Sequence, residues 1–191
     1  MASKDNQKPE GLGAEDIIGL KLLDNHTFIL NGEITDENIG QAIRWLIYEN
    51  ASDTEKTLTI YINSTGGSVT DAFALIDMMK QSKHFIRTIG VGSVMSAAFL
   101  IFTAGSKGLR FIARNASILS HQYSDEIGEV KHHDIKSFAK EAEYTNDRMV
   151  RLLKECSGLD TTTVKRKLLP PSDVWLKAEE LIDLGIADHI L

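Results

Sequence analysis

The sequence has very little cysteine: Cys156 is the only one among its 191 residues. No disulfide can therefore form within the chain, which fits a reducing compartment. Cys156 follows an amphipathic run and precedes Ser157 and Gly158, so we expect it to pack at a helix end rather than to act as a nucleophile.

The sequence also lacks long apolar runs, an excess of basic residues and metal-ligand spacings. Its longest apolar stretch, near residues 96–104, is too short to span a bilayer. The polar N-terminus has no apolar segment of signal-peptide length. The formal net charge of -6 argues against general nucleic-acid binding, and no zinc-type spacing of Cys and His occurs. We therefore expect a cytoplasmic protein with neither nucleic-acid nor membrane partners, and no metal site.

The composition fits one globular domain, with 42% hydrophobic and 25% charged residues. No stretch rich in Pro, Gly or Ser divides the chain. We expect a flexible tail over residues 1–13 and a single domain over 14–191.

Strands and helices are expected to alternate up to about residue 120, which is typical of an α/β fold built from crossover units. The spacing of apolar residues predicts helices over 14–20, from Thr35, from Val69 and from near Ser96, and a last helix over 177–184. Runs rich in β-branched residues predict strands over 26–31, 57–62, 85–90, 110–113, 117–120 and 187–191.

One long helical stretch, residues 129–155, is rich in charge and has only a thin apolar stripe. Such a helix buries little surface in a small domain and is better suited to contact a partner subunit.

Two turns follow predicted strands and carry small residues. The first, Asn63–Ser68, contains two glycines, Gly66 and Gly67, which allow a close approach of backbone to ligand. An ordinary strand-to-helix turn is the alternative. The second contains Ser96 at the start of a helix, where its hydroxyl could act as a nucleophile if a base took its proton. A simple helix cap is the alternative there.

A histidine and an aspartate could complete a nucleophilic site. His121 lies just past a β-branched strand, and histidine is the side chain that enzymes use most often for proton transfer. Asp173 follows two prolines and could orient an imidazole. The alternatives are an ordinary histidine and an aspartate that caps the last helix. The order Ser, His, Asp differs from that of the common hydrolase folds.

Taken together, these segments resemble the proteolytic subunit of Clp proteases. The resemblance rests on four ordered motifs: YINSTGGSVTDAFALIDMM, GVGSVMSAAFLIFTAGSKGLRF, LSHQY and DVWLKAEELIDLGIADHIL. It covers about residues 15–191.

The resemblance implies a Clp protease/crotonase-like α/β fold, with β-β-α superhelical repeats and a protruding helical handle over about 124–157. It implies a serine endopeptidase that needs no cofactor, with catalytic Ser96, His121 and Asp173 and an oxyanion hole of the Gly67 and Ala97 amides. It further implies two stacked heptameric rings that degrade unfolded polypeptides. An AAA+ Clp-type unfoldase would dock in a groove containing Tyr61 and Phe111.

Several positions depart from the family pattern. Thr65 replaces a proline, Ala98 replaces a glycine, Ser172 replaces an arginine, and the N-terminal segment is short. The departures at Ala98, Ser172 and the N-terminus motivate a second hypothesis, a ring subunit with little activity of its own. A third is a crotonase-type enzyme acting on acyl-CoA, which shares the fold but does not explain the three candidate catalytic residues together.

Overall fold

A computed structural model describes residues 11, 13–124, 128–129 and 131–191. The predicted tail over residues 1–13 lies outside these residues, apart from 11 and 13, as does part of the predicted handle, residues 125–127 and 130. The helices are α1 (Ala14–Asp24), α2 (Asp36–Asn50), α3 (Val69–Gln81), α4 (Ala97–Thr103), α5 (His132–Ser157), α6 (Thr161–Lys167) and α7 (Ala178–Asp183). The strands are β1 (Thr27–Asn31), β2 (Thr57–Ser64), β3 (Phe85–Met95), β4 (Arg110–Ile112), β5 (Ser117–Ser120), β6 (Val174–Leu176) and β7 (His189–Ile190).

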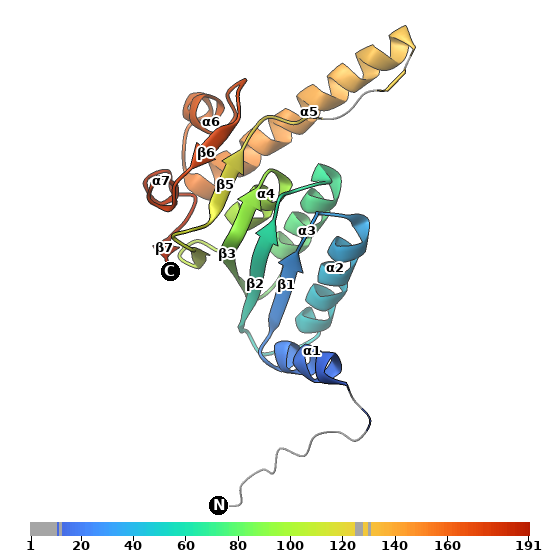
Figure 1. Cartoon of the computed structure of the whole chain (residues 1–191), viewed down its shortest axis with the longest axis vertical. Helices are drawn as coiled ribbons and strands as arrows, with labels where there is room; N and C mark the ends of the chain where they lie inside the picture. The colour runs from blue at the N-terminus through green and yellow to red at the C-terminus, as the bar shows by residue number, and fades with distance from the viewer. Residues whose placement is uncertain (1–10, 12, 125–127, 130) are drawn as a thin grey trace, which may run out of the picture.

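The strands form one sheet, in which β1, β2, β3, β4 and β7 lie side by side and run parallel. Strand β3 is the longest: its first half pairs with β4 and its second half with β5. Helices α2 and α3 lie along one side of β1 and β2, as a parallel sheet with helical crossovers requires (Figure 1). The alternating α/β fold predicted from the sequence is confirmed.

Local sequence signals explain where the helices begin. Thr35 accepts a hydrogen bond from the Asn38 amide and caps α2, as predicted. Helix α4 is buried along its whole length, which explains the apolar run that follows Ser96. None of the described helices is both long and apolar enough to cross a membrane.

The long charged helix is confirmed as α5, which projects away from the body of the molecule (Figure 1). Gly158 ends it in the left-handed conformation, with φ 81°. The projecting part exposes Ile135 and Phe138, whereas Leu152 and Leu153 near its end are buried in the core. Cys156 lies in the last turn, where burial raises the pKa of its thiol, as expected for a packing role.

Two short elements, α6 and β6, were not predicted from the sequence. Strand β6 pairs antiparallel with β5, so that Ser120 lies opposite Val174. The last helix is capped by Lys177, so the reading of Asp173 as its cap is wrong.

A buried ion pair joins β4 to the C-terminal segment. Arg110 is 1% exposed, and its guanidinium donates to both carboxylate oxygens of Asp188, at 2.9 and 2.7 Å, and to the Cys156 carbonyl at 3.0 Å. Burial alone would raise the pKa of Asp188, but the hydrogen bonds and charge of Arg110 outweigh it, so the pKa lies below its usual value.

Replacing Asp188 by Asn should therefore destabilise the protein at pH 7, by about 3 kcal/mol, because the Arg110 charge stays buried without its partner. A carboxylate with a lowered pKa stabilises the fold above its unfolded pKa of about 3.9. That contribution disappears as the pH falls through the lower folded value. Urea unfolding should show the difference from wild type at pH 7 and a narrowing difference below about pH 4. The exposed Asp183→Asn variant is the control, and an equal effect of both would contradict this account.

Candidate active site

Ser96 lies at a strained turn between β3 and α4. Its φ is 55° and its ψ is -124°, and among the described non-glycine residues only His26 shares a positive φ. Such strain costs about 1–3 kcal/mol and concentrates at functional sites. Ser96 occupies the N-cap position, yet its side chain makes no capping hydrogen bond. Its hydroxyl is therefore not a helix cap and is available for other chemistry.

The imidazole of His121 meets that hydroxyl. His121 Nε2 lies 2.8 Å from Ser96 Oγ, although 25 residues separate them along the chain. Strand β5 carries His121 at its end and pairs with the last residues of β3, just before Ser96. The Ser96 amide also donates to the Leu119 carbonyl at 2.9 Å, which ties the two segments together.

The other imidazole nitrogen fixes the tautomer. His121 Nδ1 lies 2.5 Å from the Gln122 carbonyl oxygen, and a carbonyl can only accept, so we assign the proton to Nδ1. Nε2 is then the acceptor, and Ser96 Oγ–H donates to it. This is the arrangement in which a histidine removes the proton of a serine. No sequence pattern indicates the Gln122 contact, because it depends on the backbone conformation just after β5.

No hydrogen bond joins Asp173 to His121 among the described residues. Continuing the β5–β6 register by one residue from Ser120 and Val174 sets His121 opposite Asp173. The side chain of Asp173 is exposed, and among the described residues it has no hydrogen-bond partner. His121 Nδ1–H instead donates a hydrogen bond to the Gln122 carbonyl.

The glycine turn packs directly against Ser96. Gly66 and Gly67 have φ values of 99° and 142°, and a Cβ built on Gly66 would lie 2.6 Å from Ser96 Cβ. Ile34 brackets the turn: its amide donates to the Gly66 carbonyl at 2.7 Å, and its carbonyl accepts from the Ser68 amide at 2.9 Å.

Neither of these two hydrogen bonds with Ile34 uses the Gly67 amide. Ala97 is the first residue of α4, so its amide has no acceptor within the helix. The geometry therefore brings a candidate nucleophile, a candidate base and two candidate donors for an oxyanion into one place.

Polar side chains that the sequence did not single out hold the turn in position. Ser64 Oγ, on a buried side chain, accepts from the Gly66 amide at 3.1 Å. Asn63 Oδ1 accepts from the Ser93 amide at 3.0 Å, and Asn63 Nδ2 donates to Asn31 at 2.8 Å. The Asn-Ser pair before Gly-Gly is a turn-forming sequence, which was the one available signal.

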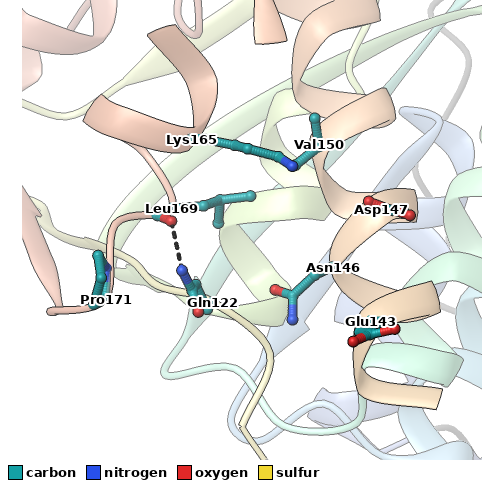
Figure 2. Close-up of a pocket in the computed structure, with 8 residues that line it drawn as sticks. All are labelled: Gln122, Glu143, Asn146, Asp147, Val150, Lys165, Leu169 and Pro171. Carbon is teal, nitrogen blue, oxygen red and sulfur yellow. Dashed lines mark hydrogen bonds between the residues drawn. The ribbon is translucent and has the colours of Figure 1, made fainter. Parts of the chain in front are cut away.

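Two hollows flank the segment that follows His121. The Gly67 hollow, of about 430 Å³, is lined by residues 67–70, by Tyr123 and Ser124, and by Glu141 and Thr145 of α5. The Gln122 hollow, of about 520 Å³, lies between α5 and α6 and is lined by Gln122, Glu143, Asn146, Asp147, Val150, Lys165, Leu169 and Pro171 (Figure 2). Gln122 Nε2 donates to the Leu169 carbonyl at 2.9 Å on the side of the hollow that faces α5.

Tyr61 and Phe111 lie on the same face of the sheet, because each is aligned with Ile89 of the strand between them. Tyr61 is 38% exposed, and Phe111 stacks on His189 with ring centroids 4.6 Å apart. The neighbouring β2 residues Ile60 and Ile62 are fully buried, so the two aromatic rings belong to the opposite, more open face.

Comparison with known proteins assigns the chain to a family. Residues 10–191 match the Clp protease family. An ATP-dependent Clp protease proteolytic subunit 1 of Leifsonia xyli subsp. xyli is 32% identical, over 94% of this chain and 89% of that protein. ATP-dependent Clp protease proteolytic subunits of Leuconostoc citreum and Ligilactobacillus salivarius are 32% and 31% identical, over 90% and 97% of this chain and 85% and 92% of those proteins. The predicted resemblance and the expectation of a serine-type peptidase are confirmed, and the chain belongs to the Clp protease family.

Proposed function

We propose that this protein cleaves unfolded polypeptides into short peptides through an acyl-enzyme formed on Ser96. The observation that carries the proposal is the 2.8 Å contact between Ser96 Oγ and His121 Nε2, in the tautomer that accepts the serine proton. His121 takes that proton while Ser96 attacks the peptide carbonyl. The Gly67 and Ala97 amides stabilise the oxyanion, and His121 returns the proton to the leaving amine. Water then repeats the cycle on the ester.

An internally quenched, unstructured peptide tests this function directly. The purified protein, under conditions where it forms oligomers, should release products whose masses correspond to internal cleavage. Ser96→Ala should release none. Peptide turnover that persists in Ser96→Ala would overturn the assignment of the nucleophile.

We further propose that Asp173 replaces the Gln122 carbonyl as the partner of His121 Nδ1 in the active assembly. Its position opposite His121 in the strand register supports this role. A carboxylate there would stabilise the imidazolium that forms during acyl transfer. Asp173→Asn should then lower kcat by about 10²-fold or more, with KM little changed.

Steady-state kinetics of Asp173→Asn, beside the exposed Asp183→Asn variant, checks this prediction. If Asp173→Asn keeps the wild-type kcat, the Gln122 carbonyl is the working partner of His121.

The absence of an Asp173 hydrogen bond among the described residues also favours the second candidate function, a weakly active ring subunit. Full kcat in the pure chain would exclude that alternative.

Assembly and partners form part of the same proposal. We propose two stacked heptameric rings, in which the projecting part of α5, with exposed Ile135 and Phe138, contacts another subunit. We also propose that a Clp-type AAA+ unfoldase docks over Tyr61 and Phe111, and that the protein works in the cytoplasm. The relatives' description as ATP-dependent supports the ATPase partner.

Tyr61→Ala should therefore abolish ATP-dependent degradation of a folded substrate while leaving hydrolysis of short peptides within about twofold of wild type, because Tyr61 lies on the sheet face away from the helices. Degradation assays with the unfoldase of the same organism, run in parallel with peptide hydrolysis, measure both. Equal losses in the two assays would contradict a docking role.

A further inference from the structure

The Gly67 hollow lies where the side chain of the cleaved substrate residue must go. Gly67 contributes both its amide, a candidate oxyanion donor, and part of the wall of the hollow. The carbonyl that Ser96 attacks belongs to one substrate residue, here called the acyl residue, and its Cα is one bond from the reacting carbon. Its side chain therefore emerges beside Gly67. The Gln122 hollow shares none of its lining residues with the turn of Gly66 and Gly67, so it does not meet this condition.

The wall of the Gly67 hollow is polar. Hydroxyl groups come from Ser68 and Thr70 on one side and from Ser124 and Thr145 on the other. Glu141 is the only lining residue that carries a full charge at neutral pH. An apolar acyl side chain would gain little contact with such a wall, whereas an ammonium or guanidinium would find acceptors around it.

Only one of the two carboxylate oxygens of Glu141 contacts other described residues. Its Oε1 atom accepts from Thr145 Oγ1 at 3.2 Å and lies 3.9 Å from Arg148 Nη2. Among the described residues, its Oε2 atom has no partner. Thr145 is buried, so this hydrogen bond gives the carboxylate a defined place on the wall.

Arg148 offsets only part of the Glu141 charge, because its Nη2 atom is 3.9 Å from Oε1 and no contact reaches Oε2 among the described residues. Its guanidinium donates to Thr145 Oγ1 at 3.1 Å and lies over the rings of Phe73 and Tyr144, at 4.7 and 5.0 Å from their centroids. Arg148, Phe73 and Tyr144 line a separate hollow on the α3 side of α5. Arg148 thus lines the hollow on the α3 side of α5, while Glu141 lines the Gly67 hollow.

From these contacts we propose that Glu141 makes the protein prefer a basic acyl residue, Lys or Arg, by placing a free carboxylate oxygen in the hollow beside Gly67. This inference rests on the proposed function, because it needs Ser96 as the nucleophile. It adds a specificity-determining residue on α5, outside the candidate triad and the oxyanion hole.

The test uses two peptidyl diphenyl phosphonates that differ only in the side chain of the acyl residue, Lys or norleucine. His121 takes the serine proton as Ser96 Oγ attacks the phosphorus; an O–P bond forms, one P–O(phenyl) bond breaks, and the phenoxide takes the proton from His121 and leaves as phenol. The second-order rate of modification is read from the mass of the intact protein, so substrate turnover is not needed. An alkyl fluorophosphonate, which lacks an acyl side chain, serves as the reference reagent.

The wild-type protein should react about fivefold faster with the Lys reagent than with the norleucine reagent, as expected for one partly exposed ion pair. Glu141→Gln should bring this ratio close to one, and Glu141→Lys should favour norleucine. Glu143→Gln is the matched control on the same helix, because Glu143 lines the Gln122 hollow instead (Figure 2). It should keep the wild-type ratio.

Different results would overturn the role of Glu141 and the proposed function of Ser96. If the fluorophosphonate modifies Ser96 but the ratio is one or less in wild type, or is unchanged in Glu141→Gln, the role of Glu141 is wrong and the proposed function stands. If the fluorophosphonate leaves Ser96 unmodified in the assembled protein, the proposed function and this inference both fail.

Discussion

Replacing Ser96 or His121 by Ala should each reduce kcat/KM for a quenched peptide by about 10⁴-fold or more, and the double variant should lose no more than either single one. The reason is that the two side chains act as a unit. The hydroxyl is a poor nucleophile without a base, and the base has nothing to activate without the hydroxyl. Their 2.8 Å contact is the structural basis for this non-additivity.

Both variants should remain folded. Ser96 contributes no capping hydrogen bond, and His121 bonds only Ser96 and the Gln122 carbonyl among the described contacts. Thermal unfolding of the variants should therefore match wild type within a few degrees, which corresponds to roughly 1 kcal/mol for a domain of this size. Losses that add in the double variant would mean that the two residues act separately, contrary to the proposed mechanism.

The second large effect is expected from Gly66→Ala. A Cβ there would lie 2.6 Å from Ser96 Cβ and 2.9 Å from the Met95 carbonyl oxygen, and the backbone at Gly66 has φ 99°. Neither neighbour can move freely, because the Met95–Ser96 segment is held by β5 through the Ser96 amide. We expect activity to fall by about 10²-fold or more, through displacement of the nucleophile and of the Gly67 and Ala97 amides.

Gly32→Ala is the matched control. Gly32 also has a positive φ, of 85°, but a Cβ there would meet nothing within 4 Å. Both variants should lose about 1–2 kcal/mol of unfolding free energy from the unfavourable backbone conformation. Gly66→Ala should lose more, because its Cβ also meets Ser96 and the Met95 carbonyl, and only Gly66→Ala should lose activity. Peptide hydrolysis and urea unfolding of the two variants separate these effects. Equal activity in both would mean that the turn does not position Ser96.

Much of the fold could be predicted because the local signals agree with the tertiary structure. The Thr35 cap, the β-branched run of β2 and the apolar spacing of α3 each point to the element that forms. No local pattern shows that Ser96 and His121 come together, and only the family resemblance predicted it. The structure places them in contact.

The parts that escaped prediction depend on contacts between distant segments. Strand β6 has only three residues, and its pairing with β5, about 55 residues earlier, decides that it is a strand. The buried pair of Arg110 and Asp188 is equally invisible in the sequence, since each residue alone reads as a surface charge. The same limit applies to the contact of His121 Nδ1 with the Gln122 carbonyl, which depends on the backbone conformation after β5.

The most direct test of the account is the site of covalent modification by an alkyl fluorophosphonate. Peptide mapping of the assembled, wild-type protein should find one adduct, on Ser96, and His121→Ala should slow its formation by about 10²-fold or more, because no base then takes the serine proton. An adduct on another residue, or equal rates with and without His121, would contradict the claim that these two side chains form the reactive centre.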